Sequence, residues 1–297
     1  MNAKTCDVLC IGHASYDLVF SIARHPGADE KLFADGLLSC GGGPAANAAV
    51  TVARLGYQAG FAGYLGNDVY GDSHCRELRV EGVDLGLLVR GASPTPLSTI
   101  LVKPDGKRVL INYKGDTQAL PAERIAFAGV QAKVVLCDGH EPHLALAASR
   151  ALPNVPTLLD AGSLHDGTRL LMDKVDYLLA SEKFALQLAG DEGDALTQMA
   201  AMAPVAVITL GERGLLWRRG EQTGRMSAPP VHALDSTGAG DAFHGAFAAG
   251  LAAGMAWEDL LRFASAAGAY CCTRIGARPG MPNTAQVAAL LQSWPAE

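Results

Sequence analysis

The stretch that decides the fold lies between residues 231 and 247 and reads VHALDSTGAGDAFHGAF. Three small residues, Gly238, Ala239 and Gly240, come directly before a long segment of helical composition. Small side chains let a ligand approach the backbone, and the free N–H groups of a helix's first turn form an anion site. Asp241 follows at the start of the predicted helix, where a carboxylate either complements the helix dipole or takes part in chemistry. Taken alone, this stretch favours neither interpretation.

The chemical interpretation is phosphoryl transfer. In it, a phosphoryl group binds to the amides of residues 238–241, while the carboxylate of Asp241 reaches an attacking hydroxyl. Phosphoryl transfer requires positioning, neutralisation of charge and a proton acceptor in line with the γ-phosphate. The stretch offers all three.

A second glycine-rich segment, residues 40–56, reads CGGGPAANAAVTVARLG. Its glycines lead into a helix of small residues that we expect to end at Gly56. Asn47 lies in the first or second turn, where its amide can face a ligand at the mouth of the helix. The segment lacks the pattern G-x-x-x-x-G-K-[ST], so it is not a P-loop.

Short apolar runs predict the central sheet. They alternate with stretches of helical character, which indicates an α/β fold whose mainly parallel sheet is covered on both faces. The runs are residues 7–12, 134–137, 157–160, 177–180 and 205–210. The last third of the chain predicts helices over 239–253, 257–272 and 283–293, with Asn283 as the N-cap of the last.

Two regions, residues 16–39 and 97–113, fall outside the alternation of strand and helix. The second predicts a hairpin with its turn at Pro104–Gly106. We interpret both regions as a small β lid over a site on the main sheet, with an exposed edge that serves as a dimer surface. The alternative is that they are edge strands of the main sheet. We treat residues 1–297 as a single domain.

Composition and charge narrow the class of protein. The chain has 297 residues, of which 49% are hydrophobic, and a net charge of −6, which argues against a nucleic-acid partner. No run of about 18 apolar residues predicts a membrane span, and the first residues do not resemble a signal peptide. The seven cysteines form no C-x-x-C pair, so neither a disulfide framework nor a zinc site is indicated. We expect a cytoplasmic protein with reduced thiols.

Together the two glycine-rich segments resemble the signature motifs of the ribokinase-like (PfkB) carbohydrate kinases, GG-x-x-x-N before a helix and D-[ST]-T-GAGD-x-F. The resemblance extends over the whole chain. It implies a three-layer α/β domain with a small β lid, and phosphorylation of a sugar hydroxyl by ATP accompanied by Mg²⁺. From the exposed edge of the lid we expect a homodimer formed through it. A nucleoside kinase, or a non-catalytic sugar- or nucleotide-sensing relative, is the alternative.

The resemblance also implies roles for single residues. Asp241 becomes the general base, and the backbone of Gly238, Ala239 and Gly240 becomes the anion hole. The residues implied to bind the sugar are Asp17, Gly42, Gly43 and Asn47. Those at the nucleotide are Thr209, Gly211 and Gly214. Those at a monovalent-cation site, which K⁺ would fill, are Asp235, Thr237, Gly276 and Gly280.

One motif departs from the family. The N-x-x-E pattern that organises magnesium-bound water aligns with residues 181–184, where Ser181 replaces the Asn and Phe184 replaces the Glu. Glu182 is near but two positions out of register. Ser181 is retained as a nucleotide-site residue, and the way in which the protein orders Mg²⁺ is left open.

Several local strings resemble one branch of the family, the bacterial sulfofructose kinases. In that branch a Lys, an Asn and an Arg are expected near the sulfonate, and Lys31 and Asn112 fit the first two. The Arg position holds His140, which has no permanent charge and no planar fork for an anion. Asp138 and Glu141 make this region more acidic. A neutral ketose is therefore at least as good a candidate as a sulfosugar. His140 is either a sugar contact or an ordinary loop residue.

Overall fold

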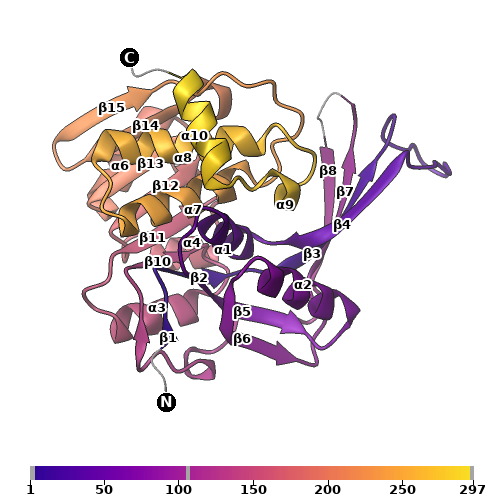
Figure 1. The fold of residues 1–297 in the computed structure, drawn as a ribbon, viewed down its shortest axis with the longest axis horizontal. Coiled ribbons are helices and arrows are strands. Elements are labelled where there is room, and N and C mark those ends of the chain that lie inside the picture. Colours follow the sequence, from indigo (N-terminus) through magenta and orange to yellow (C-terminus); the bar gives the residue numbers. More distant parts are fainter. Residues whose placement is uncertain (1–3, 105–107, 295–297) are drawn as a thin grey trace.

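The computed structural model describes residues 4–104 and 108–294 (Figure 1). Within these ranges a nine-stranded sheet forms the centre of the molecule. Its strands, from edge to edge, are β15 (Gln222–Met226), β14 (Leu215–Arg219), β13 (Val205–Thr209), β12 (Tyr177–Ser181), β11 (Thr157–Ala161), β10 (Val134–Cys137), β2 (Val8–Gly12), β5 (Ala59–Gly66) and β6 (Asp84–Gly91). The strands from β13 to β6 are parallel, whereas β14 and β15 are antiparallel. The predicted α/β class is confirmed.

Helices cover both faces of this sheet, so the fold has three layers (Figure 1). One face carries α1 (Pro44–Arg54), α2 (Val69–Val80), α7 (Ala239–Ala252), α8 (Trp257–Cys271) and α10 (Thr284–Ser293). The other face carries α3 (Pro142–Ala151), α4 (Asp166–Leu171), α5 (Glu182–Ala189) and α6 (Glu192–Met202). The predicted N-cap of α10 is confirmed, because the side chain of Asn283 accepts the N–H of Gln286.

Four further strands form a separate sheet in the order β4 (Gly36–Gly42), β3 (Ser15–Ser21), β7 (Leu97–Val102) and β8 (Arg108–Tyr113). We call it the small sheet. It stands beside the large sheet, close to α2 and α9 (Ala277–Gly280), and its strands are not edge strands of the main sheet (Figure 1). Most of the turn predicted at Pro104–Gly106 lies outside the described residues.

The glycine cluster before α1 belongs partly to a strand. Gly42 is the last residue of β4 and lies opposite Ser15 of β3. A Cβ on Gly42 would fall 2.2 Å from Oδ2 of Asp17, so glycine leaves room for this carboxylate. Gly43 then turns the chain with φ of 93°, and α1 begins at Pro44.

Helix α7 begins in a similar way. Gly238 is its N-cap and has φ of 79°, in the left-handed region that favours glycine. A Cβ at this position would also lie 2.6 Å from Cβ of Ala277 in α9. The close approach of α9 therefore requires glycine at the start of α7. None of the helices in the described ranges is long and apolar enough to cross a membrane.

Candidate active site

The two glycine-rich segments meet at the start of α7. Asn47 of α1 donates from Nδ2 to Oδ2 of Asp241 at 2.8 Å, although 194 positions separate the two residues. The carboxyl ends of β10 and β11 lie at the same place, with Asp138 directly after β10 and Asp160 in β11. Ligands of open α/β sheets bind at this edge.

The surroundings of Asp241 raise the pKa of its carboxyl to about 7. Burial is the largest cause, followed by the negative charge of Asp160, whereas the hydrogen bond from Asn47 acts in the opposite direction. Nδ1 of His244 lies 3.0 Å from Oδ2 of Asp160, and both side chains are buried. A carboxyl with a pKa close to neutrality suits a general base.

The first turn of α7 offers N–H groups next to Asp241. Ala239 already donates its N–H to the carbonyl of Ser236 at 3.3 Å. The N–H groups of Gly240 and Asp241 also belong to the first turn, where a helix has no carbonyl of its own to pair with them. An anion placed there is stabilised by these groups and by the helix dipole.

Asp17 lies on the small sheet and is buried. Burial raises the pKa of its carboxyl, and hydrogen bonds from the hydroxyls of Ser15 and Ser98 lower it. The register places Ser98 and Asn112 directly across the strands from Asp17, so the three side chains share one face of the small sheet. Ser98 had no signal in the sequence as a site residue.

The structure does not place Lys31 beside Asp17, Ser98 and Asn112. Lys31 lies between β3 and β4, in the segment 22–35 that projects beyond the small sheet (Figure 1). Its ammonium lies 5.7 Å from the centre of the Phe33 ring. Lys31 and Asn112, which were predicted to bind the same group of the substrate, therefore lie on different parts of this region.

His140 is one of three neighbouring imidazole rings. It is exposed and lies between His13 and His165, with ring centres 4.9 Å from each. Burial lowers the pKa of His13 to about 3, so this ring is neutral at physiological pH. The sequence could not reveal the group, because its members follow three different strands.

Two acidic residues near His140 accept hydrogen bonds from backbone N–H groups. Asp138 accepts the N–H groups of His13, Ala45 and His140 at 2.8, 3.1 and 2.9 Å, which ties the start of α1 to the ends of two strands. Glu141 accepts the N–H of Leu120 at 2.6 Å, and burial raises the pKa of its carboxyl to about 7.

The residues predicted at the nucleotide lie at the next strands of the sheet. Ser181 and Thr209 are partners across β12 and β13. Gly211 begins the short 3₁₀ turn η2 (Gly211–Arg213) and Gly214 follows it, both with positive φ. The hydroxyl of Ser181 caps α5 and donates to the carbonyl of Gly162 at 2.9 Å. It is thus already engaged within the protein.

The structure gives a reason for the departure in the N-x-x-E motif. Phe184 is fully buried in the core, so no carboxylate reaches the sheet edge from that position. Glu182 pairs with Arg213 at 3.0 Å. Among the described residues, no group of three or more His, Cys, Asp and Glu side chains is arranged to hold a metal ion.

The carboxylate predicted at a cation site is already surrounded by donors. Asp235 accepts the N–H groups of Gly276 and Thr237 at 2.8 and 2.9 Å, and the hydroxyl of Thr237 at 2.6 Å. Nη1 of Arg108, from β8, lies 3.2 Å from the same carboxylate. Gly280 ends α9, against Cys271. This arrangement places a guanidinium beside the predicted cation site.

A buried arginine completes the region. Arg278, in α9, is 5% exposed and lies within 3.3 Å of Oδ1 of Asn47 and 3.1 Å of Nε2 of His74. No spacing in the sequence indicates this cluster, because its members come from α1, α2 and α9.

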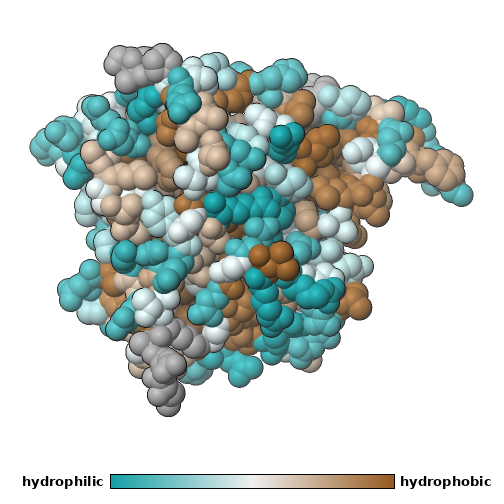
Figure 2. Space-filling model, viewed as in Figure 1, coloured by the Kyte–Doolittle hydropathy of each residue, from teal (hydrophilic) through white to brown (hydrophobic). Residues whose placement is uncertain are grey.

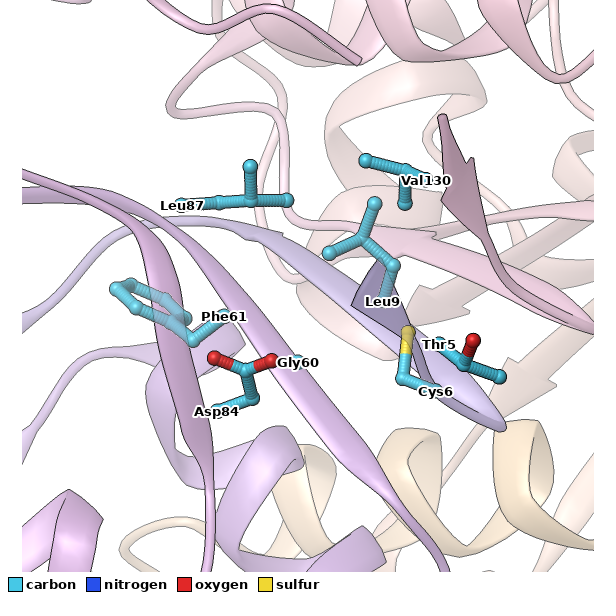
Figure 3. A pocket seen from close by; sticks show the side chains of 8 residues that line it. All are labelled: Thr5, Cys6, Leu9, Gly60, Phe61, Asp84, Leu87 and Val130. Carbon is cyan, nitrogen blue, oxygen red and sulfur yellow. The ribbon is translucent and has the colours of Figure 1, made fainter. Parts of the chain in front are cut away.

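A small cavity at the opposite end of the strands is not a second site (Figure 3). The side chains that line it surround a volume of about 10 Å³, which is enough for about one water molecule. They are Thr5, Cys6, Leu9, Gly60, Phe61, Asp84, Leu87 and Val130.

Comparison with known proteins agrees with this fold and shows the family. The family model described as pfkB family carbohydrate kinase matches residues 6–284, and the chain belongs to this family. The ribokinase of Lactococcus lactis subsp. lactis (strain IL1403) is 28% identical over 296 residues, which cover 96% of this chain and 97% of that protein. Fructokinase-1 of Oryza sativa subsp. japonica is 28% identical over 319 residues, with 96% and 98% covered.

Among solved structures, that of Arabidopsis thaliana ribokinase complexed with ribose and ATP is similar to the whole chain. Its TM-score is 0.81 at 28% identity, and the match covers 98% of this chain and 99% of that one. The expected carbohydrate-kinase family and ribokinase-like fold are thereby confirmed. The resemblance to sulfofructose kinases stays a prediction.

Proposed function

We propose that this protein transfers the γ-phosphoryl group of ATP to a hydroxyl of a small sugar, with Asp241 as the general base. The observation that carries the proposal is the position of Asp241. Its partly buried carboxyl has a pKa of about 7, accepts a hydrogen bond from Asn47, and lies in the first turn of α7, whose N–H groups favour an anion.

Each group of predicted site residues has its own role in this proposal. Asp241 accepts the proton of the attacking hydroxyl, and the amides of Gly238, Gly240 and Asp241 stabilise the phosphoryl group. Asp17 holds sugar hydroxyls from the small sheet, together with the backbone at Gly42 and Gly43. The turn Thr209–Gly214 and Ser181 border the nucleotide. Mg²⁺ that enters with ATP would neutralise charge on its phosphates, and the buried Phe184 would offer this ion no carboxylate.

The substrate class we favour is a neutral ketose or related sugar. Two observations support it. His13 is a neutral imidazole beside His140, and the nearby Asp138 and Glu141 add no positive charge. Relatives named ribokinase and fructokinase point to a neutral sugar, whereas one named ATP-dependent ribose-1-phosphate kinase points to a phosphorylated one. A sulfosugar, a nucleoside and a sensing role without catalysis are the alternatives.

A substrate panel tests the proposal. ATP consumption is measured with neutral ketoses, pentoses, sugar acids, sulfosugars and nucleosides at fixed enzyme and Mg²⁺. We expect turnover with a neutral sugar, and loss of that turnover in Asp241→Asn. Turnover with a nucleoside alone supports the nucleoside kinase, and binding of sugar without ATP consumption supports the sensing protein.

We further propose that the small sheet is a lid within one domain and that its outer face forms a homodimer. The face that carries Asp17 points toward α9, because Leu38, on the same face, packs against Gly276. The opposite face carries exposed apolar side chains on β8 and β4. Figure 2 shows apolar residues on the part of the surface where the small sheet lies. The most exposed members of this opposite face are Leu37, Val109, Ile111 and Tyr113.

A further inference from the structure

A run of buried polar contacts leads from the base of the small sheet to the carboxylate of Asp241. We propose that Arg278 is a positioning residue, which acts through Asn47 to hold Asp241 in one orientation. The inference rests on the proposed function only in taking Asp241 as the general base; the contacts themselves do not depend on it.

The first step concerns the guanidinium of Arg278. Its Nη2 lies 3.3 Å from Oδ1 of Asn47 and 3.1 Å from Nε2 of His74, and its Nη1 lies 3.7 Å from Oε2 of Glu77. The side chain is 6% exposed. A guanidinium has five N–H donors, has no acceptor and does not lose its proton in proteins. Every group that faces it at hydrogen-bond distance must therefore accept.

The second step concerns the amide of Asn47, which has one accepting and one donating end. Because Arg278 can only donate, the end that faces it is the carbonyl oxygen. The NH₂ group is then directed at Asp241, whose carboxylate accepts it at 2.8 Å. A flipped amide would set its NH₂ against the guanidinium and its oxygen against the carboxylate. Arg278 thus decides which end of Asn47 meets the base.

The third step concerns His74, which is fully buried in α2. Its Nε2 must accept from Arg278, so its proton lies on Nδ1 and the ring is neutral. Burial, and next the charge of Arg278, lower the pKa of His74 well below the usual value. The ring fits against Gly41, where a Cβ would lie 2.3 Å from Cδ2 of His74. Nη2 of Arg278 therefore donates both to Nε2 of His74 and to Oδ1 of Asn47, and neither contact can run in the opposite direction.

The effect of Arg278 on Asp241 passes through Asn47. The charges that act most on the carboxyl of Asp241 are those of Asp160, His244 and Asp138. The hydrogen bond from Asn47 favours the ionised carboxylate. Without Arg278, Asn47 is free to turn its oxygen toward Asp241, and this hydrogen bond is lost.

The test follows the carboxyl of Asp241 by ¹³C NMR in protein labelled at aspartate, with Asp241→Asn to assign the signal. Arg278→Met, Asn47→Ala and the double variant are titrated without sugar or ATP. We expect each single change to raise the pKa of Asp241 by about one pH unit, and the double variant to match Asn47→Ala. The readout needs no activity, so failure of the proposed function would not affect it.

The matched control is Arg54→Met. Arg54 donates to the carbonyls of Arg278 and Met281 at 2.9 and 2.7 Å, so it supports the same α9 backbone without touching Asn47. We expect it to leave the pKa of Asp241 in place. The proposal is overturned if Arg278→Met leaves that pKa unchanged, if its shift persists in the Asn47→Ala background, or if Arg54→Met gives an equal shift.

Arg278→Met leaves Glu77 and His74 without their buried partner and can fail to fold. A second measurement uses the unaltered protein. ¹⁵N-histidine NMR, assigned with His74→Gln, should show a protonated Nδ1 and an unprotonated Nε2 on His74 throughout the neutral range. A proton on Nε2 of His74 would mean that this nitrogen does not accept a hydrogen bond from Arg278, and it would overturn the proposal.

Discussion

Opposing influences act on the carboxylate of Asp241. Burial and the charge of Asp160 favour the protonated carboxyl, while the hydrogen bond from Asn47 favours the ionised form. The resulting pKa of about 7 lies well above the ordinary value of 3.8. A base with this pKa is half ionised near neutral pH and holds a proton more firmly than an exposed carboxylate does.

The first prediction at this scale concerns pH. A base works when it is deprotonated, so a raised pKa means that activity is lost as pH falls through about 7. We expect kcat/KM to fall about tenfold for each pH unit below that value and to level off above it. The measurement is the pH profile of kcat/KM with the best sugar.

A control separates Asp241 from a neighbour with a similar pKa. The carboxyl of Glu141 is also raised to about 7, but it serves the backbone of Leu120. Glu141→Gln should keep the acid limb of the profile. A flat profile between pH 8 and pH 5 in the unaltered enzyme would speak against Asp241 as the base.

The sequence could predict single residues where they belong to a local motif. Asp241 and Asn47 stood out because small residues and a helix start surround them. Arg278 and His74 did not, because a buried polar cluster is formed by packing of distant elements and leaves no spacing in the chain. The sequence already showed that Phe184 departs from the N-x-x-E motif. Only the structure shows that this side chain is buried in the core.

At the scale of elements, β8 of the small sheet is linked to the loop that precedes α7. Arg108 at the start of β8 donates from Nη1 to Oδ1 of Asp235 and to Oγ of Ser236, at 3.2 and 2.9 Å. Asp235 in turn holds Thr237 and Gly276. The small sheet and the residues before α7 are therefore joined through one buried carboxylate.

The second prediction follows from this link. Because Arg108 already supplies a positive charge at Asp235, we expect the same kcat when KCl is replaced by choline chloride at equal ionic strength. Arg108→Gln should lose about 1 kcal/mol or more of stability and should be stabilised by added K⁺, as measured by thermal unfolding. Arg225→Gln, on β15, is the control. Dependence on K⁺ in the unaltered enzyme would contradict the prediction.

Elements were predictable where their composition was apolar. The runs that became β2, β10, β11, β12 and β13 are rich in Val, Leu and Ile. Strand β5 escaped prediction although it is fully buried, since glycine and alanine fill half of Ala59–Gly66 or more and have low strand propensity. The glycines of residues 40–43 were expected to lead into a helix, but Gly41 and Gly42 first pair with β3, and Asp17 fits beside Gly42.

At the scale of the whole molecule, the outer face of the small sheet is the feature without a partner. Side chains on this face alternate with those on the Asp17 face, so Val109, Ile111 and Tyr113 point away from the site. Exposed apolar area of this kind marks an interaction surface, and a two-fold dimer would bury two such faces against each other.

The third prediction tests this surface. Light scattering of the unaltered protein should give twice the chain mass of 30.8 kDa. Ile111→Lys should give the mass of one chain, because a charge in the apolar face opposes association. Leu170→Lys, at a half-exposed apolar position on α4, should leave the dimer intact. A monomer in the unaltered protein, or a dimer in Ile111→Lys, would argue against the interface.

The central claim is that Asp241 removes the proton from the sugar hydroxyl, and the kinetics of Asp241→Asn test it most directly. Asparagine keeps the shape and can still accept from Asn47, but it cannot act as a base. We predict that kcat falls by about 10³-fold or more, while calorimetry shows sugar binding that is close to that of the unaltered enzyme. A variant that retains near-normal turnover would contradict the account.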